Sequence, residues 1–158
     1  MAKLSQPMVY PPTVVVRHPN EKPAKCSIWP LRHRSDFVFL VHPVKERPPL
    51  EGYVRLAAEG QELSNADAEC GLLLLDSSWR WLGPMSREFL DIPPRSLHGY
   101  QTAYPRRSKL FADPANGLAS VEALALAYHI LGRPITGLLD QYRWAEEFVR
   151  INDLKASM

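Results

Sequence analysis

The stretch Leu72-Leu73-Leu74-Leu75-Asp76-Ser77-Ser78-Trp79 decides the fold of this chain. Four consecutive leucines without alternation are typical of a strand buried on both faces, inside a parallel sheet covered by helices. Ligand sites in such α/β sheets gather at the carboxyl ends of the strands, where Asp76 lies. An aspartate there either caps a turn or acts at a site, and the indole of Trp79 beside it suits a cationic ligand. We therefore predict a single-domain α/β protein with a ligand site centred on residues 76–79.

Two apolar runs before this stretch predict further strands, at Val14–Val16 and Phe37–Val41. Neither run alternates, so we expect both strands to be buried on both faces. Pro43 ends the second run, because proline cannot donate to a strand ladder. Ser64 then predicts a short helix, since its hydroxyl can cap the first turn and Asp67 can reach back to the cap.

The chain after the leucines predicts a helix over residues 84–91, with Pro84 in its first turn, and a strand over residues 97–104. Residues 105–119 follow as a loop, and a loop of this length within a compact domain is often functional.

Two helices are expected at the carboxyl end of the chain. The first begins at Ser120 as its cap, carries Glu122 in its first turn and stops at Gly132. The second runs from about Ile135 to Leu154, where apolar residues recur at helical spacing.

Length and composition fit one domain: the chain has 158 residues, of which 46% are hydrophobic. We expect residues 1–12 to be a flexible tail and residues 13–155 to form the single domain. Two cysteines are too few for a disulfide framework or a four-ligand zinc site, and the histidines lack metal-ligand spacing. With no apolar signal-peptide core and no apolar run of about 18 residues, we expect a cytoplasmic protein without metal or membrane contact.

Charge is distributed in blocks along the chain. Residues 1–56 carry a local charge of +5 and residues 77–109 one of +4, whereas residues 57–76 contain five acids and no base. Basic residues near a site favour a phosphate-bearing partner, because binding releases condensed counterions. An ordinary solvated surface explains the same pattern equally well.

Four segments occur in the order typical of one family. They are Lys25-Cys26-Ser27 followed by Val41-His42-Pro43, Leu63-Ser64-Asn65-Ala66-Asp67 running into Leu75–Trp79, Leu118-Ala119-Ser120-Val121-Glu122-Ala123, and Leu138-Leu139 with Tyr142-Arg143-Trp144, Phe148 and Asn152. The family shows Ser-x-Ala-Asp before Asp-Cys-Ser-Trp, then Leu-Ser-x-Val-Glu-Ala and a closing Leu-Leu…Phe-x-Trp…Phe…Asn pattern. Over about residues 14–154 the chain thus resembles the ribosome-biogenesis rRNA aminocarboxypropyltransferases of eukaryotes and archaea.

This resemblance implies a SPOUT-like knotted α/β fold, with a mostly parallel sheet flanked by helices. It also implies S-adenosylmethionine as cofactor and RNA as partner, small-subunit rRNA above all. Such enzymes transfer the 3-amino-3-carboxypropyl group to a uridine or pseudouridine base and release methylthioadenosine. We expect a monomer.

Carried over by position, the resemblance implies eight cofactor-binding residues, to which Leu82 is added as a neighbour of Trp79. Leu75 would face the ribose, Leu97 and Asn116 the adenine through backbone groups, Val41 and Pro43 the adenine pocket, Ser27 and Ser120 the amino-acid end, and Trp79, with Leu82, the methyl group. Asp76 is the candidate base for the proton that the acceptor nitrogen loses. Six basic residues would hold RNA phosphates: Arg80, Arg87, Arg95, Arg106, Arg107 and Lys109.

The chain departs from the family in one loop, where Tyr104-Pro105-Arg106-Arg107-Ser108-Lys109 replaces Asn-Pro-Val-Asn-Tyr-Gly. Ser77 also replaces a cysteine. Three alternatives therefore stay open: the same transfer to tRNA, methyl transfer to RNA, and a non-catalytic RNA-binding role in ribosome assembly.

Overall fold

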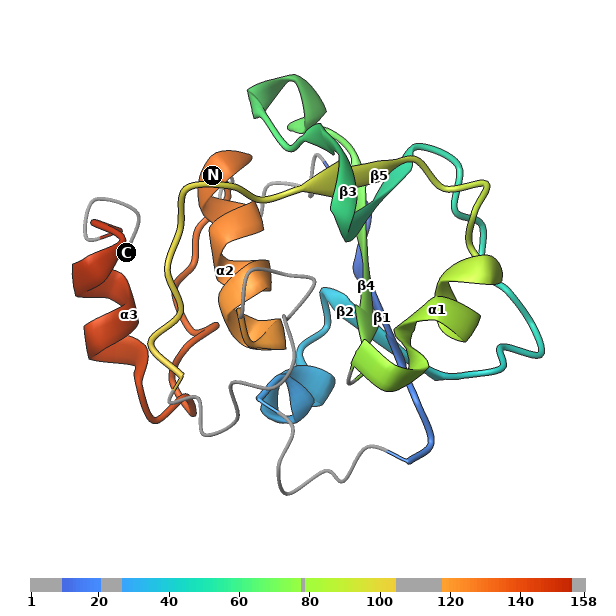
Figure 1. Cartoon of the computed structure of the whole chain (residues 1–158), viewed down its shortest axis with the longest axis horizontal. Helices are drawn as coiled ribbons and strands as arrows, with labels where there is room; N and C mark the ends of the chain where they lie inside the picture. Colours follow the sequence, from blue (N-terminus) through green and yellow to red (C-terminus); the bar gives the residue numbers. More distant parts are fainter. Residues whose placement is uncertain (1–9, 21–26, 78, 105–117, 155–158) are drawn as a thin grey trace, which may run out of the picture.

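The computed structural model describes residues 10–20, 27–77, 79–104 and 118–154, without the side chains of Trp79 and Arg80. The predicted α/β fold is confirmed: one five-stranded parallel sheet has the order β2-β1-β4-β3-β5 (Figure 1). The knotted path of the chain stays a prediction. The strands are β1 (Thr13–Arg17), β2 (Phe37–Val41), β3 (Tyr53–Glu62), β4 (Gly71–Asp76) and β5 (Pro94–Ser96).

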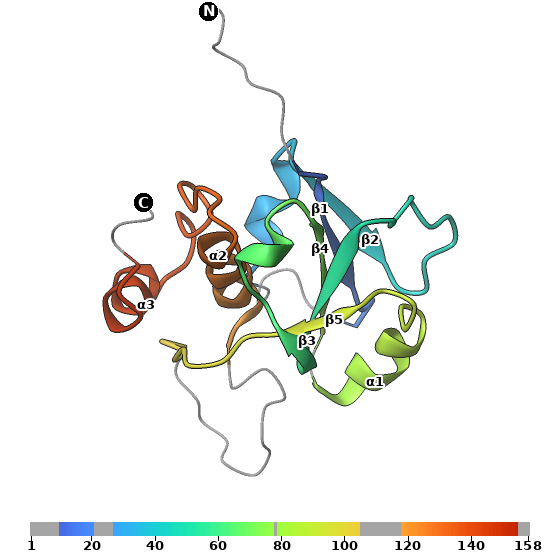
Figure 2. The ribbon, with the colours of Figure 1, turned by 90° about the horizontal axis from the view of Figure 1, so that it is seen from above.

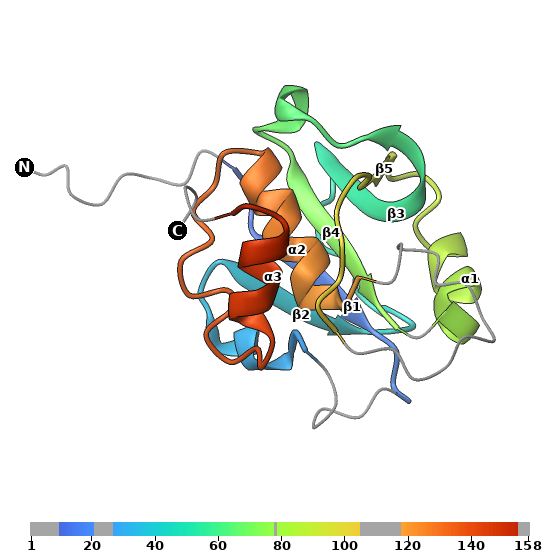
Figure 3. The ribbon, with the colours of Figure 1, turned by 60° about the vertical axis from the view of Figure 1, so that its left-hand side comes forward.

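Helices cover both faces of the sheet. Helix α1 lies on one face and α2 on the other, and α3 lies outside α2 (Figures 2 and 3). The helices are α1 (Trp79–Arg87), α2 (Ser120–Ile130) and α3 (Ala145–Ile151), with short 3-10 helices η3 (Trp29–His33) and η4 (Asn65–Asp67).

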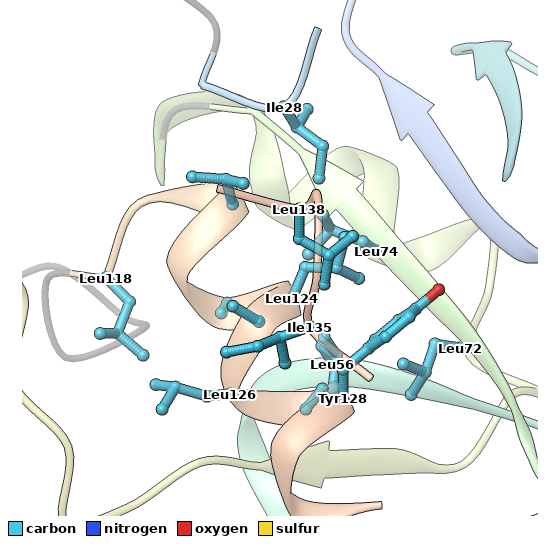
Figure 4. Packing of buried hydrophobic residues seen from close by; sticks show 14 of the residues in the cluster. Ile28, Leu56, Leu72, Leu74, Leu118, Leu124, Leu126, Tyr128, Ile135 and Leu138 are labelled. Atoms are coloured by element: carbon cyan, nitrogen blue, oxygen red, sulfur yellow. The ribbon is translucent and has the colours of Figure 1, made fainter. Parts of the chain in front are cut away.

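The leucine run of β4 supplies both hydrophobic cores, as its lack of alternation predicted. Leu72 and Leu74 belong to the core under α2, together with Leu124 (Figure 4), whereas Leu73 and Leu75 belong to the core under α1. Every residue of β4 is buried. The strand therefore ends in a buried Asp76 held between two packed layers.

The strand predictions were correct at β1 and β2 and wrong in three respects. β2 lies at the edge of the sheet and is only partly buried, because it has a neighbour on one side alone. β3 was not predicted, since residues 57–62, Ala-Ala-Glu-Gly-Gln-Glu, lack β-branched and large apolar side chains. Residues 97–104 do not form the predicted strand; the strand of this region is β5, directly before them. Its place at the edge of the sheet tolerates Pro94.

The helix predictions need four corrections. The capping box of Ser64 and Asp67 is confirmed, but the helix that it starts is one 3-10 turn. Helix α1 begins at Trp79, so Pro84 lies inside it and not in its first turn. Helix α2 has Ala119 and not Ser120 as its N-cap, because the side chain of Glu122 accepts the Ala119 N–H.

The second closing helix is also shorter than predicted. Only residues 145–151 are helical, and residues 135–144 form turns in which Gly137 has a φ of +86°. A glycine at positive φ interrupts a helix that the apolar spacing alone would continue. The apolar side chains of this segment, such as Leu138 and Phe148, are nevertheless buried in the core.

Candidate functional site

The carboxyl ends of three adjacent parallel strands meet at one edge of the sheet. Arg17 of β1 is in register with Val41 of β2 on one side and with Asp76 of β4 on the other. The backbone N–H of His18 donates to the carbonyl of Asp76 at 3.2 Å, which closes this edge. Asp76 thus lies where sites of parallel α/β proteins form.

The Asp76 carboxylate is buried and holds two partners. Its Oδ2 atom accepts from Arg17 Nε at 3.3 Å, and its Oδ1 atom accepts from the Ser120 hydroxyl at 2.5 Å. The Arg17 guanidinium also lies over the Trp29 ring, 4.5 Å from its centroid. The two hydrogen bonds fix the orientation of the carboxylate. Removing one partner of a buried ion pair would leave the other charge buried without compensation.

The first turn of α2 brings the predicted serines to this carboxylate. Ser120 binds Asp76 directly, and the next residue, Val121, donates its backbone N–H to the Ser27 hydroxyl at 3.1 Å. The structure therefore groups Ser27, Asp76 and Ser120, which lie far apart in the sequence. A helix N-terminus carrying hydroxyl groups suits a carboxylate or phosphate ligand.

Glu122 holds this helix start in place, as its position in the first turn indicated, but through partners that the sequence did not predict. Its carboxylate is fully buried and accepts from the Ala119 N–H at 2.8 Å, the Thr102 hydroxyl at 2.6 Å, the Ala103 N–H at 2.9 Å and the Tyr142 hydroxyl at 2.9 Å. The signal in the sequence was an acid within an apolar run, which indicates a buried carboxylate. A buried carboxylate needs hydrogen-bond donors from other segments.

Two further predicted residues line a hollow at the end of β2. Val41, whose exposed fraction is 58%, and Pro43 belong to a cavity of about 390 Å³ formed by residues 40–46. Leu75 directly precedes Asp76, and Leu97 directly follows β5 with its side chain in the core under α2.

The predicted RNA-binding residues are dispersed. Arg87 lies exposed in the last turn of α1, which follows β4. Arg95 pairs with Asp67 at 3.1 Å and lines a cavity of about 670 Å³ together with Tyr53 and Cys70. That cavity lies at the amino ends of β3 and β4, and Arg95 is therefore not grouped with Asp76. The side chains of Trp79 and Arg80, and all of Arg106, Arg107, Lys109 and Asn116, lie outside the described residues.

A stack of aromatic rings lies beside the hollow. The His18 ring stacks on Trp81 with centroids 4.6 Å apart and planes 15° apart, and on His42 at 6.1 Å and 24°. His42 Nδ1 lies 2.8 Å from Glu88 Oε1, and Glu88 Oε2 accepts the Val44 N–H at 3.2 Å. An ionised carboxylate only accepts, which assigns the proton to His42 Nδ1.

The part of the chain that the structure describes contains no group of three potential metal-ligating residues. No helix among the described residues has the length and apolarity needed to span a membrane.

Comparison with known proteins gives a structural match. No family model and no curated protein matches the sequence. Among solved structures, the fold is similar to that of the SAM-dependent rRNA:acp-transferase Tsr3 from Vulcanisaeta distributa, with a TM-score of 0.69 and 22% sequence identity. The match covers 91% of this chain and 80% of that chain. The two proteins thus share an α/β fold built on a five-stranded parallel sheet.

Proposed function

We propose that this protein transfers the 3-amino-3-carboxypropyl group of S-adenosylmethionine to a uridine or pseudouridine base of rRNA, and so acts as an RNA aminocarboxypropyltransferase. The observation that carries the proposal is the buried Asp76 carboxylate, bound to Ser120 in the first turn of α2, the turn in which Val121 binds Ser27. The shared fold with a SAM-dependent rRNA:acp-transferase supports the choice of this chemistry.

The polar groups around Asp76 fit both ends of an amino acid. At the start of α2, the Ser27 hydroxyl accepts the Val121 N–H and can donate to a carboxylate, whereas the Ser120 hydroxyl donates to Asp76 and would accept from the amino group. The Asp76 carboxylate suits a cationic centre, because opposite charges attract strongly where water is excluded.

The remaining cofactor contacts come from apolar side chains and from backbone groups. Val41 and Pro43 would hold the adenine in their hollow, and the backbone of Leu75, Leu97 and Asn116 would complete the nucleoside site. When bound, S-adenosylmethionine supplies a sulfonium whose three neighbouring carbons are open to attack. Trp79 would enclose the methyl group and so leave the aminocarboxypropyl carbon facing the acceptor.

Asp76 would accept the proton that the acceptor nitrogen loses. Arg17 and Ser120 fix the carboxylate from two sides. Holding the acceptor and Asp76 in alignment can lower the activation barrier by about 7–11 kcal/mol.

RNA would bind through phosphate contacts to basic residues. Arg87 is exposed on the helix that follows Asp76. Further phosphate partners in this proposal are Arg80, Arg106, Arg107 and Lys109. Arg95 is a weaker candidate, because its charge is already paired with Asp67.

The decisive experiment mixes the protein with S-adenosylmethionine and either rRNA or tRNA, and identifies the products by mass spectrometry. We expect methylthioadenosine and an aminocarboxypropyl base in small-subunit rRNA. S-adenosylhomocysteine would identify a methyltransferase, and RNA binding without cofactor binding would identify an assembly protein. Nucleosides from a deletion strain would reveal the natural acceptor by the loss of one modified base.

A further inference from the structure

His42 belongs both to the hollow at the end of β2 and to the ring stack beside it. It is one of the residues that line the cavity of about 390 Å³, and its ring faces that of His18, which in turn stacks on Trp81. The lining of the hollow therefore includes a residue whose ring belongs to a stack of three. Such a ring offers a flat surface to a planar ligand.

The rings of this stack are held in fixed orientations. Glu88 binds His42 Nδ1 at 2.8 Å, and the Asn20 N–H donates to His18 Nδ1 at 3.0 Å. The Val44 N–H binds the second oxygen of Glu88 and ties the same carboxylate to the rim of the hollow. A preorganised ring loses little conformational freedom when a ligand stacks on it.

The other sides of the hollow suit a nucleobase. Val41 and Pro43 are exposed and apolar, and Lys45 and Glu46 supply charge at the rim. A cavity of about 390 Å³ lies near the lower end of the size range of small-molecule sites. Bases stack on aromatic side chains regardless of their sequence, since every base has a π-face.

We infer that His42 is the stacking partner of a nucleobase in this hollow, with His18, Trp81 and Glu88 as positioning residues that keep its ring in place. The inference rests on the proposed function for the choice of ligand. The base is either the adenine of the cofactor or a base of the RNA, and both would use the same ring.

The test measures binding by calorimetry, with methylthioadenosine and a pentaadenylate RNA as probes and the base-free sugar methylthioribose as control ligand. His42→Ala should weaken binding of a base-containing probe by about 5- to 150-fold, the usual effect of losing one aromatic stacking partner. His42→Phe should stay within about threefold of the wild type, because phenylalanine keeps the ring. Methylthioribose binding should not change in either variant.

Variants of the supporting residues test positioning. Trp81→Leu and Glu88→Gln should cause smaller losses than His42→Ala, and Trp81→Phe should restore binding. His33→Ala, which changes an exposed histidine of η3, is the matched control. Thermal unfolding of each variant verifies that it is folded.

The two probes identify the source of the base. If His42→Ala binds methylthioadenosine more weakly, the hollow holds the base of the cofactor. If it binds only pentaadenylate more weakly, the hollow holds a base of the RNA. The inference is overturned if His42→Phe loses as much affinity as His42→Ala, if neither variant changes affinity, or if the wild type binds neither probe. Binding needs no turnover, so failure of the transfer reaction leaves this result unaffected.

Discussion

At the scale of single residues, the place of Asp76 at the end of a buried strand was predicted, whereas its contacts were not. Its place after four leucines indicated a strand-end carboxylate, and the family resemblance linked it to Ser27 and Ser120. The ion pair with Arg17 was not predicted, since 59 positions separate the two residues and no pattern in the sequence joins them. Glu88 and His42 were missed for the same reason, at a separation of 46 positions.

The role of Asp76 as base leads to a prediction about rate. Asp76→Asn keeps the size of the side chain and should lower the rate of methylthioadenosine release by about 10²–10⁴-fold. Ser120→Ala should mainly weaken cofactor binding, because its hydroxyl contacts the ligand in the proposal and the carboxylate remains. Initial rates over a range of cofactor concentrations separate the two effects. Full activity of Asp76→Asn would remove Asp76 as the base.

Glu122 leads to a prediction about stability. Glu122→Gln should lower the free energy of unfolding by about 1–3 kcal/mol, because an amide nitrogen would then face donors that the carboxylate now accepts. Urea unfolding measures the change. Glu147→Gln is the matched control, since this exposed acid pairs with Arg150 at the surface and the loss of that pair should lower the stability by less than about 1 kcal/mol. Equal effects of the two variants would contradict the structural role given to Glu122.

At the scale of elements, apolar runs were predictable and polar or interrupted ones were not. β1, β2 and β4 were found because valine, phenylalanine and leucine cluster there. β3 escaped prediction because five of its ten residues are exposed and its second half lacks large apolar side chains. The final helix was predicted too long because its apolar side chains are buried whether or not the backbone is helical.

Because β4 is buried on both faces, truncating a leucine on either face should lower the free energy of unfolding by a similar amount. Leu72→Ala, in the core under α2, and Leu73→Ala, in the core under α1, should each lower the free energy of unfolding by about 2–5 kcal/mol. Leu90→Ala, at a side chain that is 66% exposed, should change it by less than about 0.5 kcal/mol. Denaturant unfolding compares the three variants. A large difference between Leu72→Ala and Leu73→Ala would contradict equal packing of the two layers.

At the scale of the whole molecule, the sheet divides its polar features between two edges. The carboxyl edge carries Asp76, Arg17 and the hollow beside His42, whereas the amino edge carries the cavity with Arg95 and Cys70. The parallel arrangement that separates the edges was predictable from the apolar runs. The assignment of each arginine to an edge was not, because it depends on strand order and not on local sequence.

The exposed position of Arg87 on the helix that follows Asp76 leads to a prediction about RNA affinity. Arg87→Ala should weaken RNA binding and reduce the dependence of log affinity on log salt concentration by about one unit, as expected when one phosphate contact is lost. Fluorescence anisotropy at several salt concentrations measures both quantities. Arg150→Ala, in the last turn of α3, is the control and should change neither. An unchanged salt dependence in Arg87→Ala would place the RNA elsewhere.

The three-way contact at Asp76 has a consequence for biosynthesis. Arg17 precedes Asp76 by 59 positions and Ser120 follows it by 44, so the carboxylate gains its contact with Ser120 only after both strand residues have been made. Because a ribosome adds residues in order from the N-terminus, the strands β1, β2 and β4 are available before the helix that completes the site. A nascent chain that ends before residue 120 lacks the hydroxyl that binds Asp76. We therefore expect the growing chain to bind the cofactor only after α2 has left the exit tunnel.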